Sequence, residues 1–189
     1  LQGRQKSLDD HWLLPVAMVH WMEKRYREAL QTLLEPSLVH LCDSLWLYHN
    51  LVGMTSRQIQ GESERALAAF ERSISLDPNR PDTLYNFANL LKDDEPERAV
   101  QFYRRSLLIE PWQAAAWHNY GSTLSNLTDY HEALKVLKLS LLIDPVVADV
   151  WCNLGLAYFG LEDFVSAEKA FRYAISLDAS HAPSHTNLG

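Results

Sequence analysis

The sequence feature that most constrains the fold is a repeat with a period near 34 residues. Four alanines that each follow a polar turn lie 33, 34 and 34 residues apart, at Ala66, Ala99, Ala133 and Ala167. A large apolar residue follows each alanine after four positions, a small residue after seven and an acid after eleven. A fixed period of this length predicts an array of similar supersecondary units that bury their apolar faces against one another.

Each unit is expected to form two helices joined by a turn. In the unit that begins near residue 114, apolar or small residues recur at i, i+3, i+4 and i+7, on one face of a first helix. These residues are Trp117, Tyr120, Gly121 and Leu124. Asp129 is expected to cap a second helix that runs over 130–143. The acids Asp77, Glu110 and Asp144 each precede a proline, which disfavours a helical conformation before it and so ends the helix.

Gly155 is expected to mark the closest approach of two helices. The stretch WCNLGLAYFG places this residue among Trp151, Leu154 and Tyr158 on an apolar face. Helices approach closely only where neither presents a bulky side chain, so we predict that Gly155 lies opposite the small Ala167. Glycine costs about 1 kcal/mol of helix propensity relative to alanine, and close packing must recover that cost.

The spacing Trp151-x2-Leu154-Gly155-x2-Tyr158, followed by Ala167-x3-Phe171, resembles the tetratricopeptide repeat (TPR) family. The resemblance implies an all-α fold, a helix-turn-helix solenoid wound as a right-handed superhelix. About four to five repeats are expected, the last one truncated, in one continuous solenoid domain. The predicted segments are a degenerate N-terminal repeat or cap (1–43), a repeat with an insertion (44–80), three further repeats (81–113, 114–147 and 148–181) and the start of another (182–189).

Composition and motifs argue against several classes of function. The net charge is −7, and lysines and arginines are not clustered as in nucleic-acid-binding proteins. No apolar run approaches the roughly 18 residues that would span a bilayer, so neither a nucleic-acid nor a membrane partner is expected. The chain lacks a glycine-rich phosphate loop and a nucleophile motif, so we predict no enzyme activity and no cofactor. Cys42 and Cys152 are too few for a disulfide framework and favour the cytoplasm.

Two histidines have a spacing compatible with a metal site. His181 and His185 lie four residues apart, but Pro183 lies between them. The period places His181 in the turn between repeats and His185 in the position of Trp151. We therefore predict no metal and expect His185 to flank the core.

The candidate site is the concave groove that the first helices of the repeats would line. One position there recurs as Asn86, Asn119, Asn153 and Asn187, and Asn50 is assigned to the same series across the insertion. An asparagine can pair with both the C=O and the N–H of an extended peptide; the alternative is that it braces the neighbouring repeat. The other predicted groove residues are Tyr85, Asn89, His118, Ser122, Cys152, Leu156 and Phe159.

Three functions are compatible with this sequence. The first is a non-catalytic protein-interaction scaffold that binds a peptide or partner segment in the groove. The asparagine series is also similar to that of O-linked N-acetylglucosamine transferase and SPINDLY-type proteins. That resemblance implies a substrate-recruiting arm of a larger glycosyltransferase whose catalytic domain lies outside this chain. The third is self-association through the last helix, because the chain is expected to be a piece of a longer protein without a polar C-terminal cap.

Overall fold

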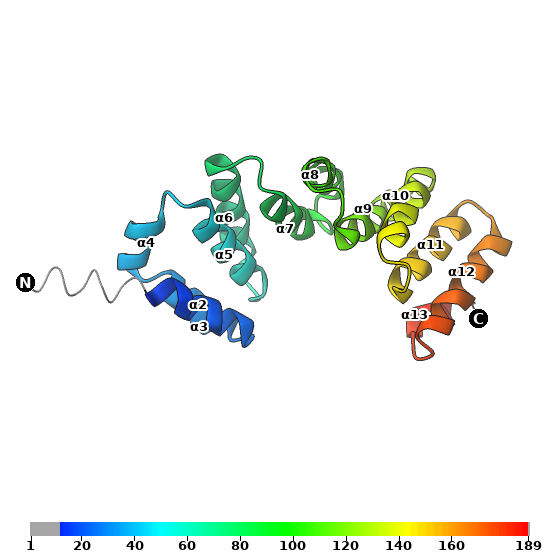
Figure 1. Cartoon of the computed structure of the whole chain (residues 1–189), viewed down its shortest axis with the longest axis horizontal. Coiled ribbons are helices and arrows are strands. Elements are labelled where there is room, and N and C mark those ends of the chain that lie inside the picture. The colour runs from blue at the N-terminus through cyan, green and yellow to red at the C-terminus, as the bar shows by residue number, and fades with distance from the viewer. Residues whose placement is uncertain (1–11, 189) are drawn as a thin grey trace, which may run out of the picture. The chain divides into compact units, whose positions relative to one another are not determined.

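The computed structural model describes residues 12–188, where helices occupy most positions and no strand occurs (Figure 1). The all-α prediction is therefore confirmed. The helices are α2 (Leu13–Met22), α3 (Tyr26–Leu33), α4 (Pro36–Cys42), α5 (Trp46–Arg57), α6 (Ser63–Leu76), α7 (Pro81–Leu91), α8 (Pro96–Ile109), α9 (Ala114–Asn126), α10 (Tyr130–Ile143), α11 (Ala148–Gly160), α12 (Phe164–Leu177) and α13 (Ala182–Leu188). The start of the predicted N-terminal cap, 1–11, and Gly189 of the truncated repeat lie outside the described residues.

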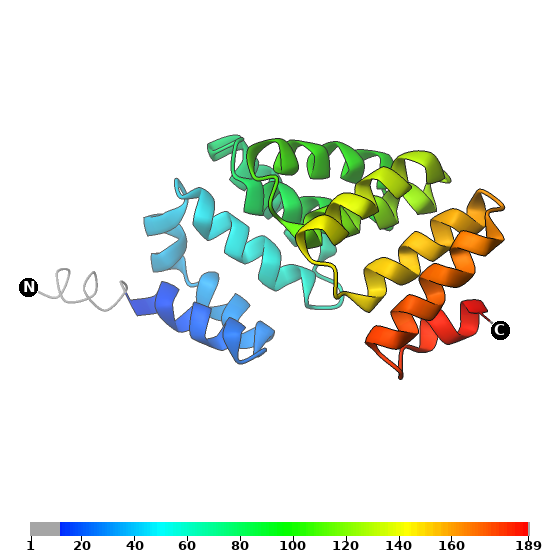
Figure 2. The same cartoon turned by 45° about the vertical axis from the view of Figure 1, so that its right-hand side comes forward.

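Packing divides the chain into two compact units, with the boundary between Leu90 and Leu91. In the first unit α2 packs on α3 and α5 packs on α6. In the second unit α9 packs on α10 and α11 packs on α12, and Figures 1 and 2 show each of these pairs side by side. These four pairs of consecutive helices are helix-turn-helix pairs of the kind that the sequence predicts. None of the described helices is both long and apolar enough to cross a membrane.

The turns that join α2 to α3, α9 to α10 and α11 to α12 share one backbone geometry. Their middle residues, Lys24, Thr128 and Glu162, have φ values of 59°, 61° and 61°. In the second of these turns the N–H of Asp129 donates to the carbonyl oxygen of Leu124 at 3.0 Å. This bond and the left-handed residue before it close the end of a helix in a common C-terminal motif.

We expect Thr128→Gly to stabilise the protein by about 0.5–1 kcal/mol. A β-branched residue is strained at positive φ, whereas glycine adopts this conformation freely; greater freedom in the unfolded chain offsets part of the gain. Thermal unfolding monitored by circular dichroism would measure the change. Thr186→Gly, inside α13, is the matched control and should destabilise instead. A lower melting temperature for Thr128→Gly would contradict this account of the turn.

Acidic side chains begin and end the helices, as the sequence predicts. The carboxylate of Asp129 accepts the N–H of Glu132 at 3.3 Å, so its predicted capping of α10 is confirmed. At the other end of α10, Asp144 accepts the N–H of Val146 at 3.3 Å. Asp163 caps α12 in the same way, and its hydrogen bonds with Ser166 hold the pKa of its carboxyl below the ordinary value.

Gly155 does lie at a close approach of two helices, but the predicted neighbour is wrong. A Cβ on Gly155 would lie 2.5 Å from the Phe171 ring, so the glycine faces that ring rather than Ala167. Gly121 faces Leu137 in the same way, at 2.6 Å. The missing Cβ therefore makes room for the large residue four positions after the alanine.

Candidate peptide-binding face

His185 occupies the position of a tryptophan. The ring N–H groups of Trp117 and Trp151 donate to the carbonyl oxygens of Pro111 and Pro145 at 2.7 and 2.8 Å. The His185 ring makes the equivalent contact, with 3.0 Å between Nε2 and the carbonyl oxygen of Ala179. The predicted equivalence of His185 and Trp151 is confirmed, but the His185 side chain is exposed and does not flank the core as expected. Residues 12–188 hold no group of three or more side chains suited to a metal ion.

His181 lies between an acid and a serine. Its Nε2 is 3.0 Å from Asp149 Oδ1, and its Nδ1 is 2.8 Å from Ser184 Oγ. These are the residue types of a nucleophilic triad. However, Ser184 is 0% exposed, and its own N–H donates to His181 Nδ1 at 3.3 Å. A substrate cannot reach this hydroxyl, so the cluster links α11 to the start of α13 and offers no accessible nucleophile.

In the second unit, asparagine side chains connect the first helices of successive repeats. Asn153 Nδ2 on α11 lies 2.7 Å from His118 Nε2 on α9. Asn187 Nδ2 on α13 donates to Cys152 Sγ on α11 at 3.6 Å. In both cases the acceptor immediately precedes the asparagine of the earlier repeat. One donor of each amide is therefore used for bracing, which is the alternative role considered for this series.

The assignment of Asn50 to the asparagine series needs correction. In the first unit Asn86 Nδ2 donates to Asn50 Oδ1 at 3.4 Å, so Asn50 accepts as His118 and Cys152 do. Asn50 lies three residues before Gly53, and His118 lies three residues before Gly121. The inserted residue lies in the turn after α5, so the register must be counted from the glycine. Asn50 is also buried, at 5% exposure.

The remaining predicted groove residues differ in how far a ligand could reach them. Asn89 and Cys152 are buried. The half-buried residues are Tyr85, Asn86, His118, Asn119, Ser122 and Asn153. The exposed ones are Leu156, Phe159 and Asn187. In the second unit the structure thus brings a braced amide at Asn153 onto the same helix as exposed Leu156 and Phe159.

Burial lowers the pKa of the His118 imidazole, while the charge of Asp149 acts in the opposite direction. The Asn153 amide nitrogen is a donor only, so His118 Nε2 accepts and the proton of the neutral ring lies on Nδ1. The neutral imidazole is therefore the form that holds Asn153 in place.

The lowered pKa of His118 predicts a loss of stability in mild acid. Below its ordinary pKa of 6.5, the unfolded chain takes up a proton more readily than the folded one, so the free energy of unfolding falls as the pH drops. The melting temperature should decline between about pH 7 and about pH 5, and less steeply in His118→Gln. His131→Gln, on the surface of α10, is the control and should decline as the wild type does. An equal decline in His118→Gln and wild type would refute this prediction.

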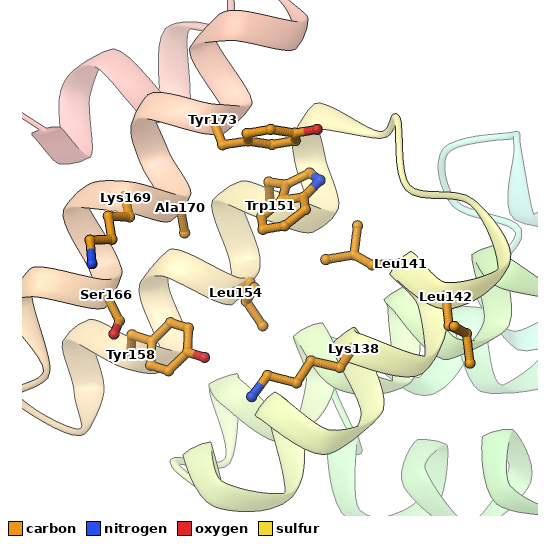
Figure 3. A pocket seen from close by; sticks show the side chains of 10 residues that line it. All are labelled: Lys138, Leu141, Leu142, Trp151, Leu154, Tyr158, Ser166, Lys169, Ala170 and Tyr173. Atoms are coloured by element: carbon orange, nitrogen blue, oxygen red, sulfur yellow. The ribbon is translucent and has the colours of Figure 1, made fainter.

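The structure also contains a cleft that sequence reasoning missed. It lies between α10 and α12, with α11 as its floor, and encloses about 640 Å³ (Figure 3). Trp151, Leu154 and Tyr158 form the floor, on the face of α11 opposite to Asn153. The positions that line this cleft recur 34 residues earlier in the sequence, and this recurrence could have been used to identify it.

Three segments of the chain, 48–80, 114–146 and 148–181, match models of the tetratricopeptide repeat. Together they cover more than half of the chain. No curated protein matched the sequence.

Several solved structures share the fold. A crystal structure of MamA matches with a TM-score of 0.78 and 17% identity, over 92% of this chain and 93% of that one. YrrB, described as a TPR protein with an unusual peptide-binding site, matches with a TM-score of 0.78 and 20% identity, over 92% and 89%. MamA 41-end from Desulfovibrio magneticus RS-1 matches with a TM-score of 0.70 and 26% identity, over 76% and 81%. The helix-turn-helix pairs, the matched segments and these structures agree, and the chain belongs to the tetratricopeptide repeat family.

Proposed function

We propose that the chain is a non-catalytic protein-interaction module that binds an extended peptide segment on the face formed by the first helices of its repeats. The observation that carries the proposal is the state of Asn153. His118 takes one donor of its amide, and within residues 12–188 its Oδ1 accepts no hydrogen bond. An amide held in this way offers a fixed acceptor to a peptide N–H.

Exposed apolar side chains on the same helix support this proposal. Leu156 is 38% exposed and Phe159 is 55% exposed, one to two turns beyond Asn153. Phe159 and Phe164 lie edge to face, 5.4 Å between ring centroids, which limits the motion of both rings. A fixed amide can form a hydrogen bond with the backbone of a peptide, and the exposed apolar side chains next to it can pack against the side chains of that peptide. The peptide-binding site named for YrrB provides an analogy.

Paired alanine substitutions test this proposal. Peptides would be selected from a random library displayed on phage, and their affinity measured by calorimetry. Asn119→Ala with Asn153→Ala should weaken binding at least about fivefold, with only a small change in melting temperature. Asn126→Ala, at the end of α9, is the control and should bind as wild type. A parallel loss of stability and affinity would assign the asparagines to bracing alone, and failure to select any peptide would overturn the proposal.

Fewer observations support the other predicted functions. The structures that this chain resembles, MamA and YrrB, lend no support to a glycosyltransferase arm. Self-association through α13 stays a prediction, which light scattering at two protein concentrations would test. We also propose a cytoplasmic location, in keeping with Cys42 and Cys152, which are both free thiols and buried.

A further inference from the structure

The second unit forms the same cleft twice, one repeat apart. The α10–α12 cleft described above has a smaller counterpart between α8 and α10, with α9 as its floor. Matching positions are 34 residues apart, and five such pairs are Arg104 and Lys138, Leu108 and Leu142, Trp117 and Trp151, Lys135 and Lys169, and Leu139 and Tyr173. Because the cleft recurs with the repeat, it is a product of the repeat fold. The sequence differences between the two copies show how one cleft differs from the other.

The α10–α12 cleft is the larger of the two, and two substitutions between repeats place smaller side chains in it. It encloses about 640 Å³ against about 350 Å³ for its counterpart. Ala170 replaces the larger Val136 in the wall, and Leu154 replaces the larger Tyr120 in the floor. Each of these two replacements removes side-chain volume from the space between the helices, whereas Tyr173 in place of Leu139 adds volume to the α12 wall.

A third substitution changes the charge of the cleft. In the smaller cleft, Lys135 Nζ lies 2.8 Å from Glu132 Oε2. Ser166 occupies the position of that glutamate in the larger cleft, so no carboxylate lines it. Within residues 12–188, neither Lys138 nor Lys169 makes an ion pair, and the two stand on opposite walls (Figure 3). The larger cleft therefore has positive edges on a chain of net charge −7.

The shape of the cleft matches the side of a helix. Its α12 wall is formed by Ser166, Lys169, Ala170 and Tyr173 at i, i+3, i+4 and i+7, a length of about 10 Å. Two turns of an amphipathic helix have the same length and place apolar side chains at the same spacing. Leu142, on the facing wall, is 79% exposed and available to such a partner.

We propose that the α10–α12 cleft binds an acidic amphipathic helix of a partner protein. Its apolar side chains would lie against Trp151, Leu154 and Tyr158, and carboxylates on its flanks would pair with Lys138 and Lys169. This is helix-in-groove recognition, with charge complementarity that selects an acidic partner over a basic one. The site lies on the opposite face of α11 from the proposed peptide site, so the two bind independently.

The test compares two synthetic peptides in calorimetric titrations. The first carries leucines at i, i+3, i+4 and i+7 with glutamates on both flanks, and the second has lysines in place of the glutamates. Because the chain is acidic overall, non-specific attraction favours the lysine peptide. We expect the glutamate peptide to bind at least about fivefold more tightly. Equal binding, a preference for the lysine peptide or no binding would overturn the proposal.

Variants locate the binding to this cleft. Lys138→Glu with Lys169→Glu, and separately Leu142→Ser, should each weaken the glutamate peptide about fivefold to tenfold. All three side chains are exposed, so the folded state should persist, as thermal unfolding would verify. Arg57→Glu, on exposed α5 surface of the first unit, and Leu108→Ser, in the smaller cleft, are matched controls that should bind as wild type. Asn153→Ala should also bind as wild type, so this test is separate from that of the other face.

Two further measurements test whether a membrane or a second copy of the chain occupies the cleft instead. Binding to phosphatidylcholine vesicles that contain phosphatidylserine, with no binding to the glutamate peptide, would assign the cleft to a membrane and overturn the proposal. A dimer in light scattering that Leu142→Ser converts to a monomer would assign it to a second copy of the chain, with the same consequence.

Discussion

Phe171→Ala is expected to lower the free energy of unfolding by about 3–5 kcal/mol. The phenylalanine is 2% exposed and lies in a core cluster with Cys152, Ala167 and Ala174. Its ring also fills the space that the missing Cβ of Gly155 leaves open. Truncation removes buried apolar surface and leaves a cavity between α11 and α12 that rigid helices cannot fully close. Urea unfolding monitored by circular dichroism would measure the loss.

Phe159→Ala is the matched control, since it truncates the same residue type in the same repeat. Phe159 is 55% exposed, so less apolar surface returns to water and the cost should stay within about 1 kcal/mol. Similar losses for the two variants would show that the Phe171 ring is not a principal contact of this repeat.

Gly155→Leu is expected to lower the free energy of unfolding by about 1–3 kcal/mol through overpacking. Even the Cβ of the new side chain would lie 2.5 Å from the Phe171 ring, a distance at which one of the two must move. The ring is buried and has little freedom to do so. The higher helix propensity of leucine recovers part of the cost, and thermal unfolding would report the balance.

A double-mutant cycle shows whether the Phe171 ring is the cause. Gly155→Ala should destabilise the wild type, because its Cβ meets the same ring atoms, and should be neutral or stabilising in a Phe171→Ala background. An equal loss of stability in both backgrounds would show that the steric conflict involves residues other than Phe171. Gly121→Ala, which faces Leu137, extends the test to the preceding repeat.

Local features of the fold could be predicted from the sequence because they depend on residues close together along the chain. The 34-residue spacing of Ala133 and Ala167 predicted the repeated helix pairs. The cap at Asp129 and the equivalence of His185 and Trp151 were correctly predicted, since each follows from register within a single repeat. Helix ends, turns and the apolar face of each helix thus required no tertiary information.

Contacts between helices could not be predicted in the same way. The sequence suggested Ala167 as the neighbour of Gly155, but the atoms that lie nearest to its missing Cβ belong to Phe171. It also placed Asn50 with the wrong set, because the extra residue in the turn after α5 shifts the register of α5 against every later repeat, and only the contact with Asn86 shows which position Asn50 occupies.

The sequence by itself therefore determined the repeat, its two helices, their ends and the face that each helix buries. Only the tertiary structure decided which side chains meet across helices: the ring over Gly155, the contact between Asn153 and His118, and the cleft at Lys138 and Lys169. The reason is physical. Periodicity fixes the direction of a side chain around its own helix, whereas its neighbour depends on the distance and offset of the second helix, which the packing of all the side chains between them sets.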